Sequence, residues 1–154
     1  MDDLWHLAAA IGTARRARAN GNHPFGAVFV IGDEQVLEAE NTVTTGRDPT
    51  GHAETNLVRL AASRSGAGQL HQGTLYTSTE PCAMCAGAIY WAGIGKVVYG
   101  LPETDLIAMT GASEQNPTLS LPCREVFARG QRSVTVEGPL LLEQARAVHE
   151  GFWG

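Results

Sequence analysis

Apolar residues recur along the first part of the chain at the spacing of an amphipathic helix. Leu4, Leu7, Ile11 and Ala14 fall three or four residues apart within the segment 3–19. Arginines cluster near the end of this segment, and the sequence Asn-Gly-Asn that follows is a helix stop signal. The pattern therefore predicts a helix over residues 3–19.

Five shorter runs, rich in apolar and β-branched residues, predict strands. The first two runs are joined by Gly-Asp-Glu, which is typical of a hairpin. In chain order the runs are GAVFVI (26–31), QVLEAEN (35–41), GTLYTS (73–78), KVVYG (96–100) and SVTVEG (133–138).

Helical spacing returns in three segments that lie between or after these strands. They are 48–64, 81–93, where proline occupies the first turn, and 139–154. The segment 101–122 is rich in Pro, Thr and Ser and predicts a less regular region. Strands that alternate with helices predict an α/β domain in which helices cover a mixed sheet of about five strands. No repeat or linker interrupts the sequence, so we expect a single domain over residues 1–154.

The composition is that of a soluble globular protein, with 44% hydrophobic and 18% charged residues. The longest apolar run near the N-terminus, LAAAIG, is short, follows two acidic residues and precedes arginines, which does not fit a membrane span or a secretory signal. We therefore expect a cytoplasmic protein with no membrane partner. The net charge of −5 argues against a nucleic-acid partner, because phosphates favour a basic surface.

Two of the three cysteines, Cys82 and Cys85, are three residues apart and follow Pro81 directly. In a reducing compartment such a pair more often binds metal or carries out redox chemistry than forms a disulfide. Both fall in the first turn of a predicted helix, where unpaired backbone N–H groups and the helix dipole favour thiolates.

His52 and Glu54 open the preceding predicted helix. If the two helices pack on the same face of the sheet, their N-termini converge, and His52 joins the two cysteines as a third metal ligand. Three protein ligands are typical of catalytic zinc, whereas structural zinc has four. A carboxylate at Glu54 can then take a proton from water and pass it to a leaving group. His-x-Glu followed by Pro-Cys-x-x-Cys is the signature of zinc-dependent nucleobase deaminases.

These motifs lie in a region that resembles the cytidine deaminase superfamily, in its branch of guanine, cytosine and tRNA adenosine deaminases. The resemblance covers about half of the chain, from HPFGAVFV through GLPETD, and includes NTVTTGRDPTGHAE, TLYTSTEPCAMCAGAIYW and KVVYG. It implies a three-layer α-β-α sandwich around a mixed five-stranded sheet and the hydrolytic release of ammonia from a base. It also implies that His52, Cys82 and Cys85 hold Zn²⁺ and that Glu54 transfers the proton.

The same resemblance suggests which residues read the substrate. Asn41 matches the asparagine that hydrogen-bonds the base, and Phe25 and Gly26 match the wall of the base pocket. Trp91 and Asp105 match positions of the guanine deaminases where an aromatic ring and an acid face the purine.

The C-terminal sequence GFWG, which contains Trp153, resembles tails that close over the substrate in free-base deaminases. In some of these proteins the tail comes from the partner subunit. We therefore expect a homodimer, with exchange of the C-terminal tails as one arrangement. Gly51 replaces the alanine that is commoner before the histidine, and residues 109–130 match guanine deaminases poorly. Both departures concern the choice of base rather than the chemistry.

Each substrate position also has an ordinary structural interpretation. Asn41 can cap a turn, Phe25 and Trp91 can be core aromatics, Asp105 can be a surface cap, and Trp153 can dock the C-terminal helix.

Three functions stay open at this point. We favour a deaminase of a small nucleobase or nucleoside, with a guanine-like base first and cytosine, isoguanine or an aminotriazine as rivals. The alternative is a tRNA adenosine deaminase that edits RNA. The third is a non-catalytic zinc-stabilised binding module, for which Cys123 is a candidate fourth ligand, although an ordinary buried thiol is the simpler interpretation of Cys123.

Overall fold

Five strands form one mixed sheet in the computed structural model, which describes residues 2–111 and 113–154. The strand order is β2-β1-β3-β4-β5, with β1 antiparallel to both of its neighbours and β3, β4 and β5 mutually parallel. The strands are β1 (Gly26–Ile31), β2 (Glu34–Glu40), β3 (Thr74–Thr79), β4 (Lys96–Leu101) and β5 (Thr135–Glu137). This confirms the predicted mixed five-stranded sheet.

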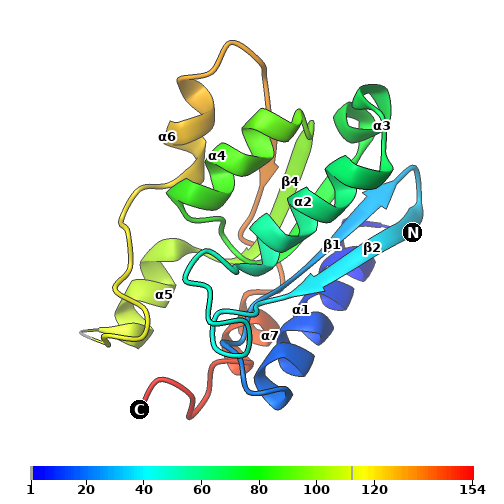
Figure 1. Cartoon of the computed structure of the whole chain (residues 1–154). Coiled ribbons are helices and arrows are strands. Elements are labelled where there is room, and N and C mark those ends of the chain that lie inside the picture. Colours follow the sequence, from blue (N-terminus) through cyan, green and yellow to red (C-terminus); the bar gives the residue numbers. More distant parts are fainter. Residues whose placement is uncertain (1, 112) are drawn as a thin grey trace.

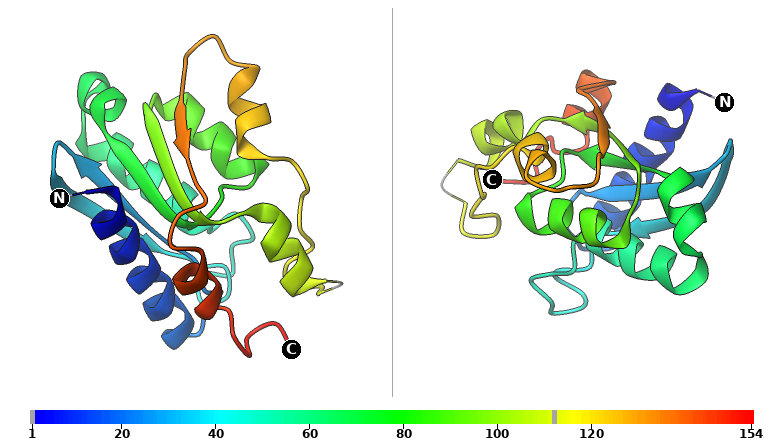
Figure 2. Two further views of the ribbon diagram at one scale, coloured as in Figure 1. Left: turned by 180° about the vertical axis from the view of Figure 1, so that it is seen from behind. Right: turned by 90° about the horizontal axis from the view of Figure 1, so that it is seen from above.

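Helices cover both faces of the sheet, which gives three layers (Figures 1 and 2). One face carries α1 and α7, and the other carries α2, α3, α4 and α6, while α5 follows β4 at one end of the sheet. The helices are α1 (Asp3–Ala19), α2 (Ala53–Arg64), α3 (Ala67–Gln72), α4 (Ala83–Ala92), α5 (Glu103–Thr110), α6 (Cys123–Ala128) and α7 (Leu142–Ala147). The α-β-α sandwich is therefore confirmed. None of the helices in the described part of the chain combines the length and hydropathy needed to cross a bilayer.

The central strands are apolar at consecutive positions because both faces of the sheet are buried. Successive side chains of a strand point to opposite faces. In β1, Val28 packs in the cluster beneath α1, and Phe29 packs in the cluster beneath α2 and α4. Val97 and Val98 divide in the same way in β4. Continuous apolar runs are expected for strands that are covered on two sides.

The sheet topology brings the N-termini of α2 and α4 together. Because β1 is antiparallel to both β2 and β3, these two strands run in the same direction and end at the same edge. α2 follows β2, α4 follows β3, and the two helices pack side by side on one face (Figure 1). The predicted convergence of the two helix N-termini is therefore confirmed.

Several element boundaries differ from the sequence prediction. α2 begins at Ala53 rather than near residue 48, because Asp48 Oδ1 accepts from the Thr50 N–H at 2.9 Å and holds a turn before the helix. α4 begins at Ala83, so Pro81 lies before the helix and not in its first turn. The segment 101–122, predicted to be irregular, contains α5. The short helices α3 and α6 were not predicted.

The predicted C-terminal helix is also shorter than expected, since α7 ends at Ala147 and turns follow it. The guanidinium of Arg18 donates to the carbonyl oxygens of Val148 at 2.9 Å and Glu150 at 2.6 Å. These carbonyls bond to a side chain from α1 and not to a further helical turn. Arg18 thus ties the C-terminal tail to the first helix.

Candidate metal centre and substrate cavity

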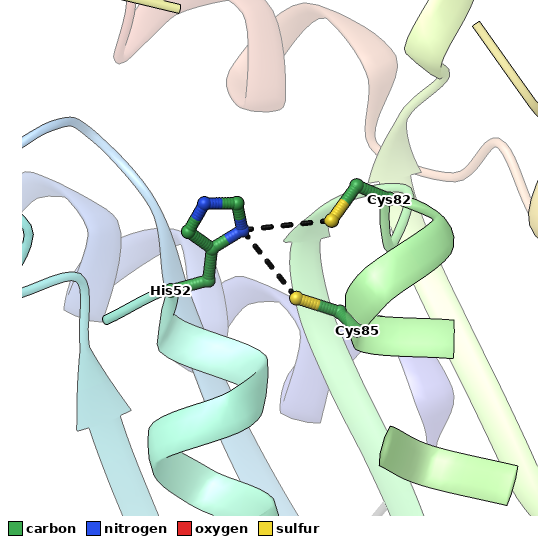
Figure 3. A group of neighbouring side chains, drawn as sticks. All are labelled: His52, Cys82 and Cys85. Atoms are coloured by element: carbon green, nitrogen blue, oxygen red, sulfur yellow. Dashed lines mark hydrogen bonds between the residues drawn. The ribbon is translucent and has the colours of Figure 1, made fainter. Parts of the chain in front are cut away.

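His52, Cys82 and Cys85 meet where α2 and α4 begin (Figure 3). His52 is the residue before the first turn of α2, Cys82 is the residue before the first turn of α4, and Cys85 lies three residues further along. Each cysteine Sγ is 3.5 Å from Nδ1 of His52. The three ligand atoms all lie within 4.8 Å of one another.

This geometry fits zinc. With Zn–N distances of about 2.1 Å and Zn–S distances of about 2.3 Å, the N···S edge of a tetrahedron is about 3.6 Å. The two observed N···S distances of 3.5 Å are close to that edge. One imidazole and two thiolates are also a donor set that zinc prefers.

Cys123 does not join this group of ligand atoms. Its thiol is buried, its N–H donates to Glu80 Oε2 at 2.8 Å, and burial raises the pKa of the thiol to about 12. A neutral, buried thiol outside the cluster leaves three ligands from the described residues, which is the number typical of a catalytic zinc site.

The three side chains polarise one another before any metal binds. A hydrogen bond from the Cys85 thiol and one from His52 lower the pKa of the Cys82 thiol to about 4, against the opposing effect of burial. The same contact with Cys82 raises the pKa of His52. The hydrogen bond to Cys82 and burial raise the pKa of Cys85. The contacts within the cluster therefore favour the thiolate form of Cys82, which is the form of cysteine that binds metal.

Glu54 lies in the first turn of α2 and is buried, with 5% of its surface exposed. Thr77 Oγ1 is 2.7 Å from Glu54 Oε1 and 2.9 Å from the carbonyl oxygen of Thr79. The hydroxyl has one hydrogen and can donate to only one of these oxygens at a time. Burial raises the pKa of Glu54, which suits a group that must both take and release a proton.

A cavity of about 460 Å³ opens onto this centre. His52, Cys82 and Glu54 form part of its wall. The remaining wall comes from the segments that follow β2, β3 and β4, from residues before β1, and from residues 114–119. The volume falls within the range of about 300–1,000 Å³ that is typical of small-molecule sites.

Of the substrate positions suggested by the resemblance, the structure brings Phe25 and Asn41 to the cavity. Gly26 does not line the cavity. It faces α1 instead, where a Cβ would overlap the helix backbone, so the glycine allows α1 to pack closely on β1. Trp153 stands behind the wall, with its ring centre 6.1 Å from that of Phe25.

Trp91 and Asp105 lie away from the cavity in this chain. Trp91 points outward from α4 and is 80% exposed. Asp105 forms an ion pair with Arg146 of α7, with 2.7 Å between Oδ2 and Nη2. The reason in both cases is helical geometry, since the buried faces of α4 and α5 are occupied by other side chains.

Sequence reasoning missed Glu80 and Glu103, which both line the cavity and are buried. Glu80 follows β3 directly and Glu103 lies two residues after the end of β4, and the carboxyl ends of parallel strands meet at one edge of a sheet. That rule was the signal that could have identified them. The lining residues 114–119 carried no comparable signal.

The sequence and the structure are similar to those of known deaminases. A family model described as the cytidine and deoxycytidylate deaminase zinc-binding region matches residues 1–101. A probable cytosine deaminase of Schizosaccharomyces pombe is 41% identical over 152 residues, which are 98% of this chain and 92% of the relative. A guanine deaminase of Bacillus subtilis is 51% identical over 82 residues, so that the match spans 53% of each protein. The solved guanine deaminase from Nitrosomonas europaea has a TM-score of 0.74 and 26% identity, covering 93% of this chain and 80% of that one.

Proposed function

The chain belongs to the zinc-binding cytidine and deoxycytidylate deaminase family, and on that premise we propose that it deaminates a free nucleobase or nucleoside by hydrolysis. One observation carries the proposal. Two of the three candidate zinc ligands, His52 and Cys82, border a single cavity of small-molecule size together with Glu54.

His52, Cys82 and Cys85 would hold the zinc ion. When bound, zinc supplies Lewis-acid activation of water. Glu54 takes one proton from the attacking water and delivers it to a ring nitrogen of the base, and then takes the second proton from the added hydroxyl group and delivers it to the departing amine. Thr77 Oγ1, 2.7 Å from Glu54 Oε1, helps to hold this carboxyl group in position. Water and the amino base yield the carbonyl base and ammonia.

Asn41 is the best candidate for a donor to the substrate. Its side chain is 1% exposed, lines the cavity, and accepts from the Val43 N–H at 3.0 Å through Oδ1. This bond fixes the orientation of the amide. The Nδ2 group is a donor and has no partner among the described residues. A carbonyl oxygen or an unprotonated ring nitrogen of a base is the matching group.

A guanine-like base is favoured within this class, and cytosine, isoguanine and aminotriazines are its rivals. Two further acids, Glu103 and Glu114, line the cavity. Carboxylates accept hydrogen bonds and match an edge rich in N–H groups. Guanine, isoguanine and aminotriazines present more such groups than cytosine does.

The alternative function is a tRNA adenosine deaminase, because RNA editing uses the same type of centre. The net charge of −5 counts against it, since RNA binding draws on a basic surface.

Release of ammonia by the zinc-loaded protein tests the proposal. The substrates are guanine, isoguanine, guanosine, cytosine, cytidine, adenine, an aminotriazine and a tRNA anticodon stem-loop. We expect turnover of a small molecule, and a loss of roughly 10²- to 10⁴-fold in kcat for Glu54→Gln with zinc retained. Activity on the stem-loop alone would establish the editing function instead. Zinc binding without any turnover would favour a binding module.

A homodimer is also part of the proposed function. Trp91 is 80% exposed on α4, and tryptophan is enriched in protein–protein interfaces. Trp153 lies near Phe25, with 6.1 Å between the ring centres, and exchange of the C-terminal tails between subunits is one arrangement of this proposed dimer. Sedimentation equilibrium decides the matter, and we expect Trp91→Ala to shift the protein toward the monomer.

A further inference from the structure

Glu103 is a buried acid at the cavity. It is the first residue of α5, 6% of its surface is exposed, and it lines the cavity beside the metal centre. Its carboxylate makes no hydrogen bond or ion pair with any described residue. Burial raises the pKa of Glu103 to about 7, with the nearby Cys82 sulfur as a second cause. An acid in this setting is costly unless donors pair with it.

The backbone of Glu103 is nevertheless firmly held. Its N–H donates to Glu80 Oε1 at 3.0 Å, and the other oxygen of Glu80 accepts from the Cys123 N–H at 2.8 Å. Glu80 thus uses both of its oxygens to fix the beginnings of α5 and α6. Both oxygens of Glu80 thus already have partners, whereas the carboxylate of Glu103 has none among the described residues.

The neighbouring acid on the same helix has a different environment. Asp105 pairs with Arg146 at 2.7 Å and does not line the cavity. The two acids therefore divide the roles, one in an ion pair between helices and one at the cavity. Asp105 provides a matched control for any change made at Glu103.

We propose that Glu103 is a specificity-determining residue, whose carboxylate accepts hydrogen bonds from ring N–H or exocyclic N–H groups of the substrate base. Asn41 Nδ2 donates to an acceptor of the same base, so the cavity requires a ligand that carries both kinds of group. The class is a lactam-type or amidine-type base with a free ring N–H away from the reacting amine. Alkylation at that nitrogen removes the donor and places a methyl group against a carboxylate. This inference rests on the proposed function and names the feature of the base that the site selects.

Equilibrium binding of product bases provides a test that does not depend on turnover. The ligands are xanthine, its 1-methyl, 3-methyl and 7-methyl derivatives, uracil and 3-methyluracil, titrated calorimetrically into the zinc-loaded protein. We expect Glu103→Gln to weaken binding of the preferred unmethylated base on the order of 10- to 100-fold, as for a lost hydrogen bond to a charged group. For the derivative methylated at the nitrogen that Glu103 reads, the variant and the wild type should bind alike. Asp105→Asn should bind every ligand as the wild type does.

Two results would overturn the inference. One is an unchanged affinity of Glu103→Gln for all the bases. The other is an equal loss for every base and every methyl derivative, because a disturbed fold would weaken all of them without regard to the position of the methyl group.

The failure of the inference can be distinguished from the failure of the proposed function. If the wild type releases ammonia from a base but Glu103→Gln gives either overturning result, only the role of Glu103 is wrong. If the wild type neither binds product bases nor deaminates any small molecule, the proposed function itself fails.

Discussion

The metal centre and the substrate wall are held in the molecule by different means. We use the term substrate wall for the part of the cavity wall that is formed by α5 and residues 113–119. The ligands of the centre stand at the beginnings of two helices whose inner residues, such as Leu57 and Ile89, are buried in one core cluster. Residues 113–119 contain neither helix nor strand, and α5 begins at a hydrogen bond to one buried acid, Glu80.

The metal centre has to meet the demands of zinc binding, whereas the substrate wall has to meet those of recognising the base. Zinc accepts few residue types, and it needs them within a few tenths of an ångström, so a rigid core is the suitable support. The wall has only to match the outline and the hydrogen-bonding groups of one base. Segments of this kind, presented by a rigid scaffold, are where specificity commonly lies.

Loss of a metal ligand should give the largest effect. For Cys85→Ala we expect zinc affinity to fall by more than the roughly 10- to 100-fold that is usual for a residue behind the ligands. Deamination should fall to the background rate. Zinc content after dialysis and ammonia release measure the two effects. Cys123→Ser is the matched control, and loss of zinc from this variant would show that the site has a fourth protein ligand.

The same division explains how much could be predicted from the sequence. The helix over 3–19, the hairpin and the later strands follow from the spacing of apolar residues, because both faces of the sheet are buried. His52, Cys82 and Cys85 could be grouped because their spacing matches a known signature and the sheet topology brings them together. In each case a strong local constraint was present.

The substrate wall lacked such a constraint. Whether Asp105 or Glu103 faces the cavity depends on the rotation of α5, which is set by contacts with distant segments such as α7. The position of Trp91 likewise depends on the rotation of α4, because a helix can present an aromatic residue either to the core or to the solvent. Pattern alone does not determine helix rotation when the apolar stripe is short.

Acid should weaken the packing of the C-terminal tail against Phe25, which lines the cavity. His149 is 4% exposed, accepts from Trp153 Nε1 at 3.0 Å, and has its ring centre 5.4 Å from that of Phe25. Burial, with the charge of Arg18 as a smaller cause, lowers the pKa of His149 to about 4. Between this value and the ordinary value near 6.5, the unfolded chain binds more protons than the folded one. The stability from His149 is therefore complete above about pH 6.5 and is lost as the pH falls through about 4.

The corresponding measurement is the free energy of unfolding at pH 7 and at pH 5, from urea titrations. Up to about 3 kcal/mol of the free energy of unfolding is linked to His149 over the full range. His149→Phe keeps an aromatic ring against Phe25 but cannot titrate, so its stability should fall less between the two pH values. The exposed His71 provides the control, and His71→Gln should follow the wild type. Parallel losses in the wild type and in His149→Phe would contradict the assignment.

We expect Glu80→Gln to destabilise the substrate wall without affecting the metal centre. The amide has one oxygen, so only one of the backbone N–H groups of Glu103 and Cys123 keeps its acceptor, and the other faces an NH₂ group. A buried donor without a partner costs about 1–3 kcal/mol, which urea unfolding can resolve. We expect a raised KM with unchanged zinc content. Loss of zinc from Glu80→Gln would show that the wall and the centre are one cooperative unit.

Asp105→Asn should have the smallest effect of all. The ion pair with Arg146 is partly exposed, with side-chain exposures of 28% for Asp105 and 49% for Arg146. Exposed pairs of this kind contribute no more than about 1 kcal/mol, and neither side chain lines the cavity. Urea unfolding should show a small loss, and KM for the substrate base should not change. A raised KM that matches that of Glu103→Gln would mean that α5 turns when a base is bound and presents Asp105 to it. In that case the wall would be a part of the site that forms with its substrate, and the centre alone would be preformed.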